Sequence, residues 1–186
     1  LARTVFTPYY LHSAGHANSL HGDGRLSVQP PGDEPADHFD YDPDNPVPTL
    51  GGNNTTWTQM KFAVDQVLPG PIDQRPVERR DDVLVYTSEV LAQDLEVTGP
   101  LEVVLFAGSS ASDTDFTAKL VDVHPGGQAI QTRGLVIPAF RASSRAWAAR
   151  AARFSPAPIP AGATSGLATK KFWRTLTRPC LRLLSL

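Results

Sequence analysis

Proline and glycine are spaced so closely along this chain that they limit which regular elements it can form. There are 17 prolines and 14 glycines among 186 residues, a content that favours many turns over long helices. Between these turns, apolar and β-branched residues alternate with polar ones, as in strands with one buried face. Residues 1–140 contain no segment of convincing length with the 3.6-residue helical period. The sequence therefore predicts an antiparallel β-sandwich.

The expected strands are short and are separated by turn sequences. They are Arg3–Leu11, Arg25–Gln29, Asp82–Thr87, Asp94–Thr98, Leu101–Ala107, Asp115–Val123 and a short strand pair around Ala129–Phe140. The run Leu101–Ala107 is almost entirely apolar, which predicts a central strand covered on both faces and paired with Asp94–Thr98 across Gly99-Pro100. Pro125-Gly126-Gly127 predicts a turn, and the proline-rich segment Pro30–Pro48 excludes a regular element.

Within Asp115–Val123, alternate residues predict two distinct faces. Phe116, Ala118 and Leu120 share one face of this strand, and polar residues occupy the other.

Charge divides the chain near Arg141. Residues 1–140 carry all 19 acidic residues and eight basic ones, whereas residues 141–186 carry nine basic residues and no acid. An acidic body repels phosphate, so nucleic-acid binding is not expected of it.

No apolar run approaches the ~20 residues of a membrane span, so no membrane partner is expected. The single cysteine, Cys180, excludes an internal disulfide and favours a reducing, cytoplasmic location. Position 1 is leucine, and we expect the chain to begin partway through a longer product.

No motif for catalysis or cofactor binding occurs in the chain. It contains no GxSxG nucleophile elbow, no P-loop and no GxGxxG. Cys180 has no histidine near it in sequence, which argues against a thiol nucleophile. We therefore expect no catalytic residue, no cofactor and no metal ligand in this chain.

Three groups of polar residues admit either a ligand or a purely structural role. His12, His16 and His21 could hold zinc on a helix, but their Gly/Ser/Asn surroundings predict a loop with turn hydrogen bonds. Asp40, Asp42 and Asp44 imitate the start of a calcium loop, yet Pro46 and Gly51 replace its glycine and glutamate, so loop-capping carboxylates are favoured. A third group could bind an anion or form surface ion pairs. Its members are Asp73, Arg75, Glu78, Arg79, Arg80, Asp81 and Asp82.

Four stretches of the chain together carry a family resemblance. They are Tyr9–Ser27, Tyr41–Gly52 (YDPDNPVPTLGG), Pro71–Phe106 (PIDQRPVERRDDVLVYTSEVLAQDLEVTGPLEVVLF) and Ser112–Gly127 (SDTDFTAKLVDVHPGG). These stretches resemble the C-terminal domain of CocE/NonD hydrolases, the family of bacterial cocaine esterases and Xaa-Pro dipeptidyl-peptidases. The resemblance implies a jelly-roll, galactose-binding-like β-sandwich that follows an α/β-hydrolase domain. In that family the Ser-His-Asp triad belongs to the hydrolase domain, so no catalytic residue carries over.

The resemblance implies a complete enzyme that hydrolyses esters or Xaa-Pro peptides through a serine nucleophile. This chain, inactive alone, would support one side of the active-site cleft. Between Gly51 and Gly70, the side chains of Trp57, Met60 and Phe62 either contact the substrate cleft or pack on the domain's own surface. A free-standing jelly-roll module that binds carbohydrate or a similar ligand is the alternative function. The sequence leaves the oligomeric state open.

The family pattern breaks after Val136. Ile137 and Ala139 stand where arginines are expected, and Pro138 removes a backbone donor from an expected inner strand. We therefore expect a jelly-roll domain over residues 1–140 that lacks its last strands. Residues 141–186 are expected to form an irregular basic tail that is not native to the fold, as a frameshift would produce; a genuine basic tail is the alternative. An incomplete sandwich would leave a strand edge uncovered and prone to aggregation.

Overall fold

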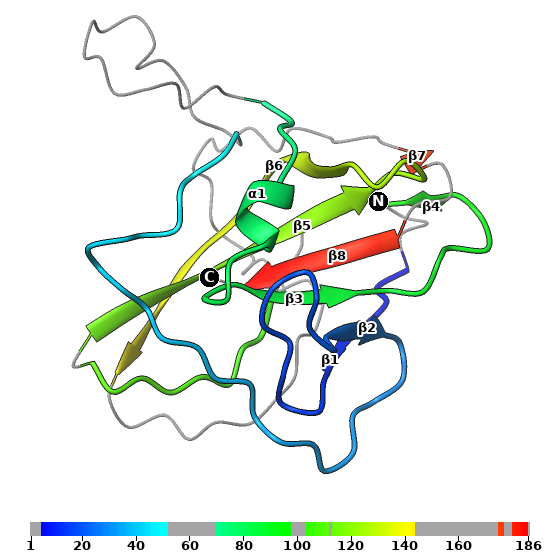
Figure 1. Cartoon of the computed structure of the whole chain (residues 1–186). Coiled ribbons are helices and arrows are strands. Elements are labelled where there is room, and N and C mark those ends of the chain that lie inside the picture. Colours follow the sequence, from blue (N-terminus) through cyan, green and yellow to red (C-terminus); the bar gives the residue numbers. More distant parts are fainter. Residues whose placement is uncertain are drawn as a thin grey trace, which may run out of the picture.

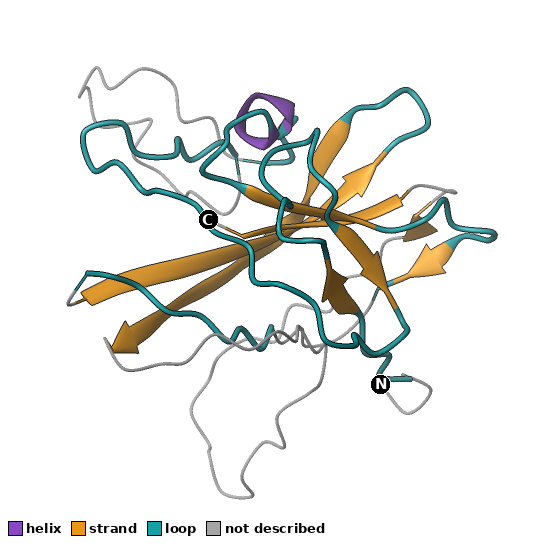
Figure 2. Ribbon diagram, turned by 60° about the horizontal axis from the view of Figure 1, so that its bottom comes forward, coloured by secondary structure: helices purple, strands orange, loops and turns teal. Residues whose placement is uncertain are grey.

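The protein consists mainly of β-strands. The computed structural model describes residues 5–51, 70–97, 103–111, 113–143, 175–176 and 180–185. Within these ranges the elements are β1 (Tyr10–His12), β2 (Arg25–Ser27), α1 (Arg75–Glu78), β3 (Leu84–Thr87), β4 (Leu95–Glu96), β5 (Asp113–Val123), β6 (Ala129–Ser143), β7 (Thr175–Leu176) and β8 (Cys180–Ser185). Figures 1 and 2 show their arrangement. None of the described helical residues builds a helix long and apolar enough to cross a bilayer.

Six strands form the main sheet, in the order β1-β2-β3-β8-β5-β6. All neighbours in it are antiparallel except β2 and β3, which run parallel. In Figure 1, β8 lies between β3 and β5, although it comes from the other end of the chain. A second sheet of two antiparallel strands is formed by β4 and β7.

Two apolar cores use alternate residues of the same strands. In β3, Leu84 and Tyr86 belong to the first core, whereas Val85 belongs to the second. The members of the first core are Leu11, Ala17, Leu26, Leu84, Tyr86, Val103, Ala118 and Leu120. Those of the second are Val77, Val83, Val85, Val121 and Ala129. Since successive side chains of a strand point to opposite faces, the middle of the main sheet is buried on both faces.

Several predictions from the sequence are confirmed. Strands β2, β3 and β5 lie within or overlap the predicted segments, and Ala118 and Leu120 share the first core as their alternation predicted. The turn at 125–127 closes with a hydrogen bond of 2.8 Å from the Gly127 amide to the His124 carbonyl, and Gly127 has φ of +81°. That positive φ is a conformation in which glycine carries no side-chain penalty.

The prediction of a central strand at Leu101–Ala107 is wrong for the described part, residues 103–107, which form no strand. Val103 is buried in the first core, but Phe106 is 49% exposed. Strand β4, the expected partner, pairs with β7 instead. An apolar run becomes a strand only where a partner strand meets it, and the central position between β3 and β5 is occupied by β8.

The expected short strand pair around Ala129–Phe140 is one long strand, β6, at the edge of the main sheet. Phe116 pairs with Phe140 and Ala118 pairs with Ile137, so Pro138 and Ala139 together oppose Thr117. This is a β-bulge. Since β6 is an edge strand, Pro138 does not lie in an inner strand. A bulge on an edge strand tolerates the backbone donor that proline lacks.

The prediction of an irregular tail is wrong for residues 180–185. These residues form β8, which pairs with four residues of β3 and six of β5. Strands β3 and β5 consequently have no open edge, and the edges of the main sheet are β1 and β6. The basic, Ala- and Pro-rich composition of the whole segment concealed a short leucine-rich stretch at its end that is suited to a strand.

Helix α1 is a single turn that the sequence reading did not predict. A proline near its start is compatible with the first turn of a helix. Val77 and Glu78 are buried, and Val77 belongs to the second core. This turn therefore covers part of one face of the main sheet.

Candidate functional site

Residues 13–24, between β1 and β2, are held against the sheet by a carboxylate from the proline-rich segment. Asp37 Oδ1 accepts hydrogen bonds from Ser13 Oγ (2.6 Å) and the Ala17 amide (3.0 Å), and Asp37 Oδ2 accepts one from the Tyr86 hydroxyl (2.6 Å). Tyr86 is 4% exposed and belongs to the first core. Asp37 thus fastens two loops to strand β3.

A second carboxylate, Glu34, fastens the end of β1. Its Oε1 lies 2.7 Å from His12 Nδ1, and its Oε2 accepts a hydrogen bond of 3.1 Å from the Ser13 amide. The other ring nitrogen of His12, Nε2, lies 3.1 Å from Ser27 Oγ. Serine, histidine and glutamate in this order have the connectivity of a hydrolase triad.

Another contact of His12 connects this group to residue 29. Nε2 also lies 3.0 Å from the Gln29 carbonyl oxygen, which can only accept hydrogen bonds. Nε2 therefore lies against the Gln29 carbonyl as well as the Ser27 hydroxyl, so the ring connects residues 27 and 29 to β1. Ser27 Oγ in turn accepts a hydrogen bond from the Gln29 amide at 3.1 Å. We therefore interpret these contacts as a structural clamp between β1, β2 and residues 29–34.

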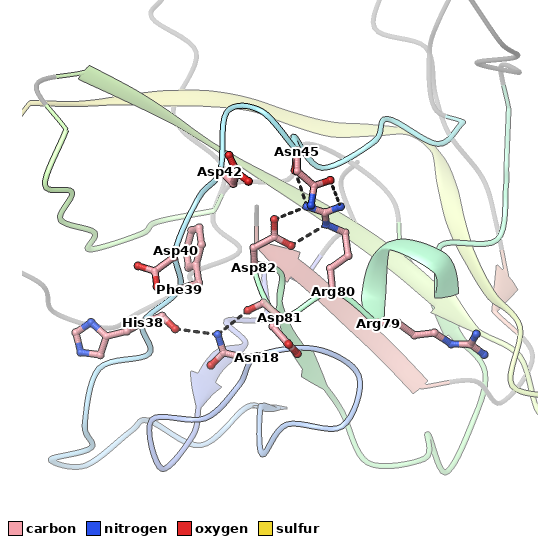
Figure 3. A pocket seen from close by; sticks show the side chains of 10 residues that line it. All are labelled: Asn18, His38, Phe39, Asp40, Asp42, Asn45, Arg79, Arg80, Asp81 and Asp82. Carbon is pink, nitrogen blue, oxygen red and sulfur yellow. Dashed lines mark hydrogen bonds and ion pairs between the residues drawn. The ribbon is translucent and has the colours of Figure 1, made fainter.

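A polar depression of about 550 Å³ lies where residues 38–45 meet the turn before β3 (Figure 3). It is lined by Asn18, His38, Phe39, Asp40, Asp42, Asn45, Arg79, Arg80, Asp81 and Asp82. The side-chain amide of Asn18 donates to the carbonyls of His38 and Asp81, both at 2.8 Å. Asn18 thereby joins two walls of the depression.

Arg80, one of the residues that line this depression, is held by hydrogen bonds to two others. Its guanidinium donates to both carboxylate oxygens of Asp82, at 2.8 and 2.6 Å, and to the Asn45 carbonyl at 2.7 Å. These hydrogen bonds lower the pKa of Asp82, because they favour its ionised form over the protonated one. The positive charge of Arg80 is thus already paired. In Figure 3 the side chain of Arg79 points away from the depression.

An equivalent pair connects the start of α1 to β6. Arg75 donates to Asp73 Oδ2 from Nε at 2.8 Å and from Nη2 at 2.5 Å, and these bonds lower the pKa of Asp73. Asp73 Oδ1 also accepts from the Ala129 amide at 3.3 Å. Of the two readings of this charged cluster, the ion pairs of Arg75 and Arg80 support the structural one.

A layer of buried polar side chains lies next to α1. Gln74, Glu78 and Lys119 are each at most 3% exposed. Lys119 Nζ donates to Gln74 Oε1 at 3.2 Å, and burial lowers the pKa of Lys119 because the charged amine loses its hydration. Gln74 donates in turn to the carbonyls of Leu50 and Ile72. This layer ties residue 50 and α1 to strand β5.

The residues expected at the substrate cleft, Trp57, Met60 and Phe62, lie outside the described residues. The described ends of their segment, Gly51 and Gly70, lie side by side, since a Cβ built on Gly51 would collide with the Gly70 carbonyl. Both glycines have positive φ, +66° and +106°. The segment between these two glycines therefore begins and ends at one place on the domain, beside Gln74.

The other sequence-predicted groups have structural contacts. Asp42 Oδ1 accepts a hydrogen bond of 2.9 Å from the Asp44 amide, as a loop-capping carboxylate does. His12 belongs to the Glu34 clamp, and the His16 amide is within 3.3 Å of Asp23 Oδ1. In the described part of the chain, no three His, Cys, Asp or Glu side chains are grouped closely enough to hold a metal ion.

Sequence reasoning missed Glu34 and Asp37. Both lie in the proline-rich segment that is predicted to be irregular, and no spacing or motif identifies their partners, which are contributed by β1, the loop after it and β3. The only available signal was the presence of carboxylates in a segment without regular structure. The backbone of such a segment needs side-chain hydrogen bonds to hold it in place.

Comparison with known proteins decides the family. The model of the family described as the X-Pro dipeptidyl-peptidase C-terminal non-catalytic domain matches residues 1–168. The chain belongs to this family. The predicted family resemblance is therefore confirmed, and this non-catalytic domain is one that accompanies serine hydrolases of the CocE type.

Relatives of this C-terminal domain are much longer than the chain. Cocaine esterase from Rhodococcus sp. (strain MB1 Bresler) is 52% identical over 130 residues, which cover 70% of this chain and 21% of that protein. Two solved structures share the fold at a TM-score of 0.58. They are an alpha-amino acid ester hydrolase, with 24% identity over 97% of this chain and 28% of that one, and an aminopeptidase from a marine sediment archaeon, Thaumarchaeota archaeon, with 21% identity over 97% and 29%.

Proposed function

We propose that this chain is the jelly-roll domain that follows an α/β-hydrolase domain, packs on it and supports one side of its active-site cleft. The observation that carries the proposal is the 52% identity to the cocaine esterase over 130 residues, combined with the family match. The substrates of the complete enzyme would be esters or Xaa-Pro peptides, cleaved by a serine nucleophile of the hydrolase domain. The single cysteine supports a cytoplasmic location.

The contacts of the described residues suit a supporting role. Their carboxylates and guanidinium groups are used to fasten loops, as at Asp37 and Asp82. Loops fixed in this way present a rigid surface, and a rigid surface loses little entropy when it docks on a neighbouring domain.

An exchange of domains tests this proposal. The matching part of the Rhodococcus cocaine esterase is replaced by this chain, and hydrolysis of 4-nitrophenyl acetate is measured beside the unaltered enzyme and the enzyme without its C-terminal domain. We expect the exchanged enzyme to recover soluble yield and turnover that the shortened enzyme lacks. Turnover no higher than that of the shortened enzyme would contradict the proposal.

We further propose that Trp57, Met60 and Phe62 contact the substrate cleft. The segment that contains them begins and ends at the paired glycines Gly51 and Gly70, which are anchored beside Gln74. In the exchanged enzyme, Trp57→Ala should raise KM for esters with a bulky acyl group and leave the melting temperature unchanged. A lower melting temperature with unchanged KM would instead place Trp57 in the domain's own packing.

A further inference from the structure

A single buried glutamine joins the two ends of the segment that runs from Gly51 to Gly70. The side-chain amide of Gln74 donates to the Leu50 carbonyl at 3.1 Å and to the Ile72 carbonyl at 2.9 Å. One of these carbonyls lies just before the segment and the other lies shortly after it. Gln74 is fully buried, so water does not compete for these hydrogen bonds. Both amide hydrogens of Gln74 are thus used to hold the two ends together.

Gln74 is itself held in position by two strands. Its backbone amide donates to the Ala129 carbonyl at the start of β6, at 2.7 Å. Its side-chain oxygen accepts a hydrogen bond of 3.2 Å from Lys119 Nζ of β5, and Lys119 is 3% exposed. A buried amide whose donors and acceptor all have partners has one favoured orientation. Strands β5 and β6 therefore fix where Gln74 holds the two ends of the segment.

We propose that Gln74, supported by Lys119, is a positioning residue that determines which acyl groups the complete enzyme accepts. It touches no substrate and acts only through the carbonyls of Leu50 and Ile72, between which the segment with Trp57 begins and ends. This inference rests on the proposed function, in which Trp57 contacts the substrate cleft. A displacement at the base of such a segment is sufficient to change specificity, because a misplacement of about 1 Å far from the chemistry can cost on the order of a hundredfold in rate.

Gln74→Glu tests the two donors alone. Glutamate has nearly the shape of glutamine and keeps an oxygen for Lys119, but its ionised carboxylate has no hydrogen to donate to Leu50 or Ile72. In the exchanged enzyme this variant should raise KM for 4-nitrophenyl benzoate about fivefold or more. KM for 4-nitrophenyl acetate and kcat for both esters should stay unchanged. The control Gln128→Glu makes the same substitution at an exposed glutamine and should change none of these values.

A coupling measurement separates positioning from a general loss of stability. If Gln74 acts through the segment, Gln74→Glu combined with Trp57→Ala should raise KM for the benzoate ester no further than Trp57→Ala alone. Should Gln74→Glu not fold, Lys119→Met takes its place in the same measurements, because it removes the donor to Gln74 Oε1 and keeps both carbonyl contacts. An unchanged KM, an equal rise for both esters, or strict additivity with Trp57→Ala overturns the proposal.

Failure of the proposed function is recognised separately, because the exchanged enzyme with native Gln74 then has no turnover. The role of Gln74 is in that case tested on the chain alone with trypsin, whose one site between Gly51 and Gly70 is Lys61. Release of the two ends should speed cleavage after Lys61 at least about threefold relative to Gln128→Glu, since proteolysis follows local opening. Equal cleavage rates would show that Gln74 does not hold the segment.

Discussion

At the scale of single residues, Asp37 accepts three hydrogen bonds that hold its segment and residues 13–17 to strand β3. In Asp37→Ala the buried Tyr86 hydroxyl and the Ala17 amide lose their acceptor. Leaving buried donors without their acceptors should lower the free energy of unfolding by about 3 kcal/mol. Chemical denaturation measures this change, with Asp33→Ala, an exposed carboxylate of the same segment, as the control expected to stay within about 0.5 kcal/mol of the native chain.

A double-mutant cycle separates the contribution of the tyrosine. If Asp37 acts partly through Tyr86, the combined Asp37→Ala and Tyr86→Phe variant should be less destabilised than the sum of the two single variants. Strict additivity would contradict this assignment.

The Arg80–Asp82 pair predicts a dependence of stability on acid. Because Arg80 lowers the pKa of Asp82 below its ordinary value of 3.8, the carboxylate binds protons more readily in the unfolded chain than in the folded one. Its contribution is therefore complete above about pH 4, and it is lost as the pH falls from there through the lowered pKa. Asp82→Asn should be less stable at pH 7 and should lose less stability on acidification, as urea denaturation at both pH values would measure.

The neighbouring carboxylate supplies the control for this pH dependence. Asp81→Asn changes an exposed side chain of the same turn and should keep the acid dependence of the native chain. An Asp82→Asn variant that loses as much stability between pH 7 and pH 3 as the native chain would refute the role assigned to the pair.

Sequence reasoning succeeded at this scale where partners are close in the chain. Arg80 and Asp82 are two residues apart, as are Arg75 and Asp73, so a dense cluster of mixed charge predicted ion pairs without any knowledge of the fold. It failed where partners are distant. Asp37 and Tyr86 lie 49 positions apart, and nothing local in either segment indicates the other.

At the scale of elements, the loop before β2 approaches strand β3 so closely that only glycine fits. A Cβ built on Gly24 would collide with the Val85 carbonyl, and the Gly24 carbonyl itself accepts a hydrogen bond of 3.1 Å from the Thr87 amide. Gly24→Ala should therefore push β2 away from β3 and lower the free energy of unfolding by about 1–3 kcal/mol. Thermal denaturation compares it with Gly32→Ala, whose added methyl group has no atom within 4 Å. Equal stability of the two variants would contradict the close approach.

The same scale shows what apolar patterning can and cannot predict. The alternation in β3 and β5 was sufficient to identify these strands, because alternate residues of each strand belong to the two different cores. The apolar run at residues 103–107 was misleading, since a strand also needs a partner strand beside it. Strand β8 holds the central position, and composition averaged over residues 141–186 gave no sign of it.

At the scale of the whole molecule, membership in a non-catalytic domain family predicts that the chain alone does not hydrolyse esters. The contacts of His12 agree with a structural role, because Nε2 lies against the Gln29 carbonyl as well as the Ser27 hydroxyl. The purified chain should therefore release 4-nitrophenol from 4-nitrophenyl acetate no faster than buffer, and phenylmethanesulfonyl fluoride should leave its mass unchanged. Ser27→Ala and the native chain should give the same rate. A rate above buffer that Ser27→Ala abolishes would show instead that serine, histidine and glutamate act as a triad on this domain.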